Sequence, residues 1–166
     1  MPCAKTLLIV YHSMTTGTQQ MAQAVHDGAL LEPEVRTRLL HASAAGVADV
    51  LQADGYVFAT PENLAAISGL MKDFFDRTYY GVLDHVHGRP YAALVCAGSD
   101  GSNAARQINR IATGWRLQPV AEPLVICTHA QTPAAIAAPK QISPQDLAQC
   151  RALGHALASG LALGVF

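Results

Sequence analysis

The sequence has little net charge, no basic cluster and no long apolar run. Its 11 Lys and Arg residues face 12 Asp and Glu residues, so the formal charge is -1 at pH 7. A nucleic-acid partner normally requires a basic patch, which is missing here. The apolar tail at residues 157–166 is too short to span a bilayer, and the N-terminus does not resemble a signal peptide. These absences predict a cytoplasmic protein with neither a nucleic-acid partner nor a membrane span.

Two further absences concern cysteine pairs and metal-ligand spacings. The four cysteines form no C-x-x-C pair, and they are Cys3, Cys96, Cys127 and Cys150. In a reducing cytosol this pattern predicts buried free thiols. The His-rich segment Asp84-His85-Val86-His87 matches no familiar metal site, so we predict a solvated loop there and assign no metal.

Short apolar segments alternate with segments of helical periodicity along the chain. Continuously apolar runs predict buried central parallel strands at residues 5–11, 56–60, 91–97 and 124–128. The alternating pattern at residues 35–40 predicts an edge strand. Helical stripes fill the intervals, with a short helix near residues 47–52 and a last helix capped by Ser143. The pattern predicts one domain over residues 1–166, an α/β fold with a three-layer, doubly wound sheet of five parallel strands.

The loop after the first predicted strand combines hydroxyl groups, a glycine and a helix start. The backbone N–H groups of a helix N-terminus bind anions, and hydroxyls add donors. No Lys or Arg lies between Lys5 and Arg36, so a triphosphate loop with its lysine is excluded, and we predict a single phosphate held by neutral groups. An ordinary N-capped helix is the alternative. The candidate residues are Ser13, Met14, Thr15, Thr16, Gly17 and Thr18.

Two more loops follow strands of the predicted sheet at the edge where such sheets bind ligands. Ligands of doubly wound sheets lie outside the carboxyl ends of the strands. The second loop offers backbone groups, a carboxylate and an amide, and the third has two glycines that permit close approach of the backbone. The candidates are Pro61, Glu62, Asn63 and Leu64 in the second loop, and Ala97, Gly98, Ser99, Asp100 and Gly101 in the third.

These segments resemble the flavodoxin-like family of FMN-binding proteins. The first loop is similar to the phosphate loop of that family, although Thr16-Gly17 stands where Gly-Asn is common. Residues 59–77 are similar to the segment G-T-P-x-x-x-x-x-x-S-G-x-x-K-x-F-x-D-R of NAD(P)H-dependent FMN and quinone reductases with this fold. The shared positions include Thr60, Pro61, Ser68, Gly69, Lys72, Phe74, Asp76 and Arg77.

The resemblance implies the strand order 2-1-3-4-5, with FMN bound across the three loops. The first loop then holds the phosphate, and the other two line the isoalloxazine ring. Flavin redox chemistry belongs to the cofactor, so we assign no catalytic side chain. The implied function is an oxidoreductase that passes electrons from NADH or NADPH, through FMN, to a small acceptor such as a quinone or a flavin. Proteins of this resemblance often pair, so residues 74–75 and 161–166 are candidates for either core or a homodimer surface.

Three other functions compete with the reductase. A flavodoxin-type electron carrier is disfavoured because the chain lacks strong acidity and its ring-contacting loops lack aromatics, unless Tyr79, Tyr80 or Trp115 reaches the ring. For Trp115, on an apolar helical stripe, a core position is favoured. A cofactor-free binding module fits the altered phosphate loop. A serine hydrolase using Ser99 departs from the G-x-S-x-G motif.

Arg106 and Arg110 lie four residues apart on one predicted helix. The simplest interpretation is two solvated side chains, and the alternative is contact with the phosphate of a nicotinamide nucleotide.

Overall fold

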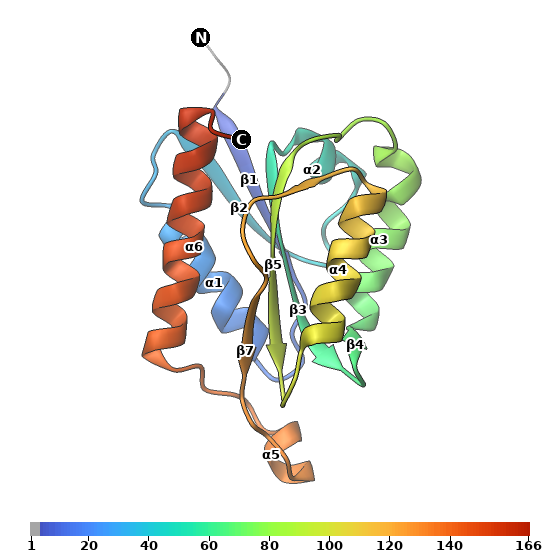
Figure 1. Cartoon of the computed structure of the whole chain (residues 1–166), viewed down its shortest axis with the longest axis vertical. Helices are drawn as coiled ribbons and strands as arrows, with labels where there is room; N and C mark the ends of the chain where they lie inside the picture. The colour runs from blue at the N-terminus through green and yellow to red at the C-terminus, as the bar shows by residue number, and fades with distance from the viewer. Residues whose placement is uncertain (1–3) are drawn as a thin grey trace.

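A computed structural model describes residues 4–166 and shows helices on both faces of a parallel sheet (Figure 1). Helices α1 and α6 cover one face, and α2, α3 and α4 cover the other. The strands are β1 (Lys5–Tyr11), β2 (Val35–His41), β3 (Gly55–Asn63), β4 (Ala66–Ile67), β5 (Pro90–Ala97), β6 (Gln118–Pro119) and β7 (Leu124–Cys127). The helices are α1 (Gly17–Ala29), α2 (Val47–Gln52), α3 (Gly69–Val82), α4 (Ser102–Gly114), α5 (Pro133–Ala137) and α6 (Pro144–Leu163).

The sheet has the predicted order, with two additions. Strands β2, β1, β3 and β5 lie side by side and run parallel, and β2 is the predicted edge strand. The fifth position is divided, because β6 pairs with the start of β5 and β7 pairs with its end. Pro119 and Pro123 lie at this interruption, where a residue without an N–H cannot complete the ladder. The five predicted strand positions are therefore confirmed, and β4 adds a short antiparallel strand beside β3.

Apolar side chains form one core layer on each face of the sheet. The layer beneath α1 and α6 includes Met21, Val25 and Leu157. The opposite layer is aromatic, and Trp115 contacts Phe75 there with ring centroids 5.5 Å apart, which confirms its predicted core position. Phe74 and Phe75 also lie in this core, so they do not form an exposed dimer surface.

The close packing of α1 against α6 depends on glycine. A Cβ on Gly28 would lie 1.9 Å from the carbonyl oxygen of Arg151, and one on Gly154 would lie 1.9 Å from that of Val25. Helix α6 begins as predicted, because the Ser143 hydroxyl accepts a hydrogen bond from the Asp146 N–H at 3.1 Å. Within residues 4–166, no helix combines the length and apolar character that crossing a bilayer requires.

The cysteine prediction holds in part for the described residues. Cys96, Cys127 and Cys150 are free thiols; Cys96 and Cys150 are buried and Cys127 is partly exposed. Burial raises the pKa of the Cys150 thiol to about 12. Cys3 lies outside the described residues.

Candidate functional site

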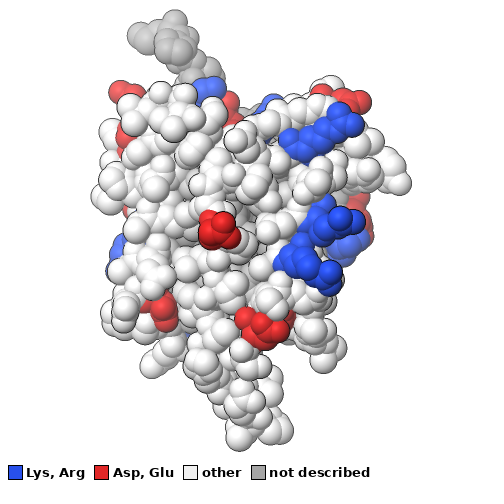
Figure 2. Space-filling view, viewed as in Figure 1, with Lys and Arg blue, Asp and Glu red and all other residues white. Residues whose placement is uncertain are grey.

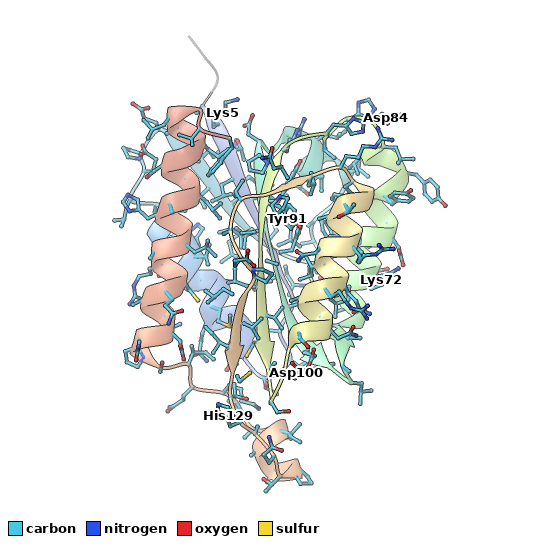
Figure 3. All side chains as sticks on the ribbon, viewed as in Figure 1. Lys5, Lys72, Asp84, Tyr91, Asp100 and His129 are labelled. Atoms are coloured by element: carbon cyan, nitrogen blue, oxygen red, sulfur yellow. The ribbon has the colours of Figure 1, made fainter. Side chains whose placement is uncertain are left out.

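A cavity of about 550 Å³ opens at the carboxyl ends of β1, β3, β5 and β7. This volume is within the range of sites that bind small molecules and cofactors. Figure 3 shows this end of the sheet, with Asp100 and His129 near it, and Lys5 and Asp84 at the opposite end. The lining residues are Ser13, Met14, Thr15, Gly17, Thr18, Pro61, Glu62, Asn63, Leu64, Cys96, Ala97, Gly98, Thr128, Ala130, Ile136 and Lys140.

The first loop contributes five of its six predicted residues to the cavity. Thr16 is the exception, because its hydroxyl donates instead to the Lys140 carbonyl at 3.3 Å. Thr16 is also the N-cap of α1 and has a φ of 69°, a left-handed conformation in which a β-branched residue is uncommon. Among the described residues, the hydroxyls of Ser13 and Thr18 are buried and lack a hydrogen-bond partner. A buried hydroxyl is usually paired, so two unpaired hydroxyls at a helix N-terminus indicate a ligand.

The second loop forms a β-hairpin, which the sequence analysis did not predict. Strand β3 continues through Asn63 and turns back into β4, which pairs Glu62 with Ile67. Pro61 to Leu64 line the cavity as predicted. The hairpin turn is strained, because Leu64 and Ala65 have φ values of 50° and 62°.

Glu62 lies in the cavity wall and also binds the backbone at the start of α4. Its carboxylate oxygens accept hydrogen bonds from the N–H groups of Gly101 at 2.9 Å and Ala104 at 3.2 Å. An acidic group at this position complements the positive end of the α4 dipole. The carboxylate therefore fixes the hairpin to the start of α4.

The third loop contributes less to the cavity than predicted. Ala97 and Gly98 line it, whereas Ser99, Asp100 and Gly101 are not among the lining residues. Gly101 is the N-cap of α4 with a φ of 81°, and a Cβ there would lie 2.5 Å from Val125 Cγ1. The glycine is thus required by packing and backbone conformation. Asp100 accepts a local hydrogen bond from the Ser102 N–H at 3.3 Å.

The segment after β7 completes the cavity, and our sequence prediction did not include it. Thr128, Ala130, Ile136 and Lys140 come from this segment, which includes the unpredicted helix α5 below the sheet in Figure 1. Lys140 adds a cation from far along the chain to the wall of this cavity, whereas the sequence predicts a phosphate held by neutral groups alone. No local pattern places a residue at position 140 beside a loop at positions 13–18.

Cys96 forms part of the cavity wall beneath the first loop. A Cβ on Gly17 would lie 2.7 Å from its sulfur, so only glycine fits there without a shift. Burial raises the pKa of the Cys96 thiol, against the opposing effect of the Lys140 charge. The Thr18 hydroxyl also lowers that pKa, but a thiol is a weak partner and Thr18 Oγ1 still lacks a hydrogen bond by geometry.

A histidine precedes the first loop and supports the second. His12 is buried, and its Nδ1 lies 2.7 Å from Ser68 Oγ at the N-cap of α3. The Ser68 N–H donates to Thr60 Oγ1 at 3.1 Å, so β1, β3 and α3 meet in one network. Burial lowers the pKa of His12, and nearby His41 lowers it further, which favours a neutral imidazole.

A second, basic groove of about 370 Å³ lies beyond the hairpin. Figure 2 shows the Lys and Arg side chains gathered over α3 and α4. The residues that line this groove are Ala66, Ile67, Lys72, Arg106, Gln107, Arg110 and Ile111. Lys72 pairs with Asp76 at 2.7 Å and Arg106 donates to Asn103, whereas Arg110 has no ion pair among residues 4–166. The structure thus brings Arg106 and Arg110 into one groove.

The remaining candidates do not assemble into other sites. None of the described residues lining the cavity is aromatic, and Tyr79, Tyr80 and Trp115 lie elsewhere. The histidine side chains of the described chain form hydrogen bonds with Ser68, Gln23 and Ser43, and none of them binds the Ser99 hydroxyl. Among residues 4–166, no group of three His, Cys, Asp or Glu side chains is arranged to hold a metal ion.

Sequence comparison relates this chain to flavoproteins. A family model described as NADPH-dependent FMN reductase matches residues 42–132, more than half of the chain. A flavodoxin of Aquifex aeolicus is 33% identical over 95 residues, which are 57% of this chain and 51% of that protein. A type A flavoprotein of Rhodobacter capsulatus is 43% identical over 61 residues, which are 34% of this chain and 14% of that protein. The matched segments therefore span about half of the first relative and less of the second.

Solved structures share the fold. A flavodoxin from the domain Archaea has a TM-score of 0.77 at 18% identity, with 95% of this chain and 99% of that chain covered. The flavodiiron protein of Giardia intestinalis has a TM-score of 0.77 at 19% identity, with 95% of this chain but 36% of that chain covered.

Proposed function

The chain belongs to the family of NADPH-dependent FMN reductases, and from this premise we propose that it is an oxidoreductase that uses NADPH or NADH to reduce a small acceptor through bound FMN. The protein is an FMN-binding flavoprotein with the flavodoxin-like fold.

The cavity has the features that an FMN site requires. In our proposal Ser13, Thr15 and Thr18 hold the phosphate through hydroxyls and backbone N–H groups at the start of α1. The two buried, unpaired hydroxyls support this assignment, because a phosphate oxygen would satisfy them. Pro61 to Leu64 and Ala97 to Gly98 line the opposite walls and would hold the ring. Bound FMN supplies the redox chemistry itself, and the protein binds and orients it.

The single observation that favours a reductase is the absence of aromatic side chains from the described cavity wall. A tyrosine or tryptophan stacked on the ring would cover it. The side chain at the hairpin tip is instead Leu64, which is fully exposed. The walls therefore leave room for a second flat molecule, such as a nicotinamide or a quinone, beside the cofactor.

The basic groove supports a phosphorylated donor. Arg110 lacks an ion pair in the described chain, and Arg106 and Lys72 add positive charge to the same groove. Hairpin β3–β4 separates this groove from the cavity, because its first strand lines the cavity and its second strand lines the groove. We propose that the groove binds the 2′-phosphate that NADPH carries and NADH lacks. Arg110→Ala should then raise the KM for NADPH more than the KM for NADH.

The proposed function is tested with purified protein under anaerobic conditions. A yellow protein that releases FMN and is rapidly bleached by NADPH or NADH supports the reductase. A yellow protein bleached only by a one-electron donor contradicts the reductase and favours a flavodoxin-type carrier, which the relative named flavodoxin makes the second candidate. A colourless protein that FMN cannot reconstitute would instead support the cofactor-free module.

A further inference from the structure

We infer that Lys140 supplies the positive charge for the phosphate of FMN, and that this residue sets the preference for FMN over unphosphorylated riboflavin. The inference rests on the proposed FMN site and concerns binding rather than electron transfer. It adds a charged residue from the segment between α5 and α6 to a loop that otherwise contains only neutral groups.

Both backbone polar groups of Lys140, the N–H and the carbonyl, form hydrogen bonds with the first loop. Its N–H donates to the Thr15 carbonyl at 2.8 Å. Its carbonyl accepts from Gln20 Nε2 at 2.7 Å and from Thr16 Oγ1 at 3.3 Å. The side-chain oxygen Oε1 of Gln20 also accepts from the Ile142 N–H at 3.1 Å. Residues 140–142 are therefore fixed to the first turn of α1.

The side chain of Lys140 begins over the same turn. A Cβ built on Gly17 would lie 3.4 Å from Lys140 Cβ and 3.5 Å from its Cγ, so the lysine stem covers the glycine closely. Glycine here leaves the space that the lysine stem covers.

The ammonium group of Lys140 is held in place and keeps one donor. It donates to the carbonyls of Ile136 at 2.8 Å and Ala138 at 2.6 Å. An ammonium has three N–H donors, so one remains for an anion. Because the carbonyl contacts already order the long side chain, less entropy is lost when the anion binds.

The other groups in the cavity leave this charge unopposed. Glu62 is the only acidic residue among the described lining residues, and its oxygens bind the start of α4. The raised pKa of the Cys96 thiol keeps it neutral. Thr18 is 1% exposed, lines the cavity and has an unpaired hydroxyl. This hydroxyl supports an anion site here independently of the helix terminus.

The test compares FMN and riboflavin binding to flavin-free Lys140→Met protein by titration calorimetry. Methionine keeps most of the stem over Gly17 and removes the charge. We expect FMN to bind on the order of tenfold more weakly and riboflavin to bind unchanged, because only FMN carries the phosphate. Lys140→Arg should restore most of the FMN affinity. In the unmodified protein, added salt should weaken FMN binding more than riboflavin binding, and Lys140→Met should remove that difference.

Lys5→Met is the matched control, because Lys5 pairs with Asp54 at the opposite end of the sheet (Figure 3). It should leave both affinities unchanged. Equal weakening of FMN and riboflavin by Lys140→Met would reduce Lys140 to a purely structural role and overturn the inference. Unchanged FMN affinity, or failure of the unmodified protein to bind FMN, would also overturn it. The titration uses no electron donor, so loss of the proposed reductase activity would leave its outcome intact.

Discussion

Replacing Thr18 by valine should stabilise the flavin-free protein and weaken FMN binding. The Thr18 hydroxyl is buried in the first turn of α1 with no hydrogen-bond partner. Burying an unsatisfied hydroxyl costs about 1–3 kcal/mol, and valine fills the same volume without it. Threonine and valine have similar helix propensities, so the backbone effect is small. We expect a gain of about 1 kcal/mol in unfolding free energy, or roughly 2–4 °C in melting temperature for a chain of this size.

The same substitution should have the opposite effect on the ligand. A hydrogen bond to a charged group contributes about 1.5–3 kcal/mol, so FMN should bind roughly tenfold to a hundredfold more weakly. Denaturant unfolding of flavin-free protein measures the first effect, and calorimetric titration with FMN measures the second. Opposite signs in the two assays would identify a hydroxyl retained for binding at a cost to stability.

Thr37 provides the matched control for this experiment. Its hydroxyl is likewise buried and unpaired, but it lies on the edge strand β2. Thr37→Val should stabilise the protein by a similar amount and leave FMN affinity unchanged. The reasoning fails if Thr18→Val binds FMN as tightly as the unmodified protein, or if it destabilises the flavin-free protein.

Three further predictions concern the scaffold of the site. Gly101→Ala should lower the unfolding free energy, measured by denaturant titration, by about 2–4 kcal/mol, because residue 101 has a φ of 81° and a Cβ there would lie 2.5 Å from Val125 Cγ1. Gly69→Ala is the control, and it should have little effect because a Cβ on Gly69 would have no atom within 4 Å. Glu62→Ala should cost about 1 kcal/mol by removing the acceptor for two N–H groups of α4, and an unchanged thermal midpoint would contradict this. Burial, and to a smaller extent the charge of His41, lower the pKa of His12 in the folded protein below the ordinary value of 6.5. As the pH falls, the unfolded chain therefore binds a proton at this residue before the folded protein does. The unfolding free energy should keep its full value above pH 6.5 and decrease below it. His12→Gln should flatten part of that decline in melting temperatures recorded across the pH range.

The fold could be predicted because its signals are local. Continuous apolar runs identified the strands β1, β3, β5 and β7, and the alternating pattern identified the edge strand β2. Ser143 and Pro144 gave the start of α6, because a cap and a first-turn proline act within a few residues. The hairpin β3–β4 was missed since its turn uses Leu64 and Ala65, and neither is a residue that a left-handed turn favours.

The candidate site was predictable only where one short segment carries it. Ser13 to Thr18 follow a strand and begin a helix, so chain order alone brings their donors together. Lys140 lies beside this loop because the segment between α5 and α6 packs against the start of α1. The contacts that hold it there join residues 120 or more positions apart in the sequence. Ser99 and Asp100 were included because their loop follows β5, but Gly101 turns the chain into α4 immediately beyond the cavity.

Strain and unsatisfied polarity are concentrated around the cavity. Six described residues other than glycine have a positive φ. Thr16, Leu64, Ala65 and His129 lie in loops at the carboxyl ends of the strands, and Asp84 and Arg116 follow the ends of α3 and α4. Such conformations cost on the order of 1–3 kcal/mol each, and the same region holds the unpaired Ser13 and Thr18 hydroxyls. A sequence selected for stability alone would replace these residues. FMN binds the folded state in our proposal and would offset part of this cost by mass action. The melting temperature should therefore rise with FMN concentration, and Thr18→Val should reduce that rise while Thr37→Val preserves it.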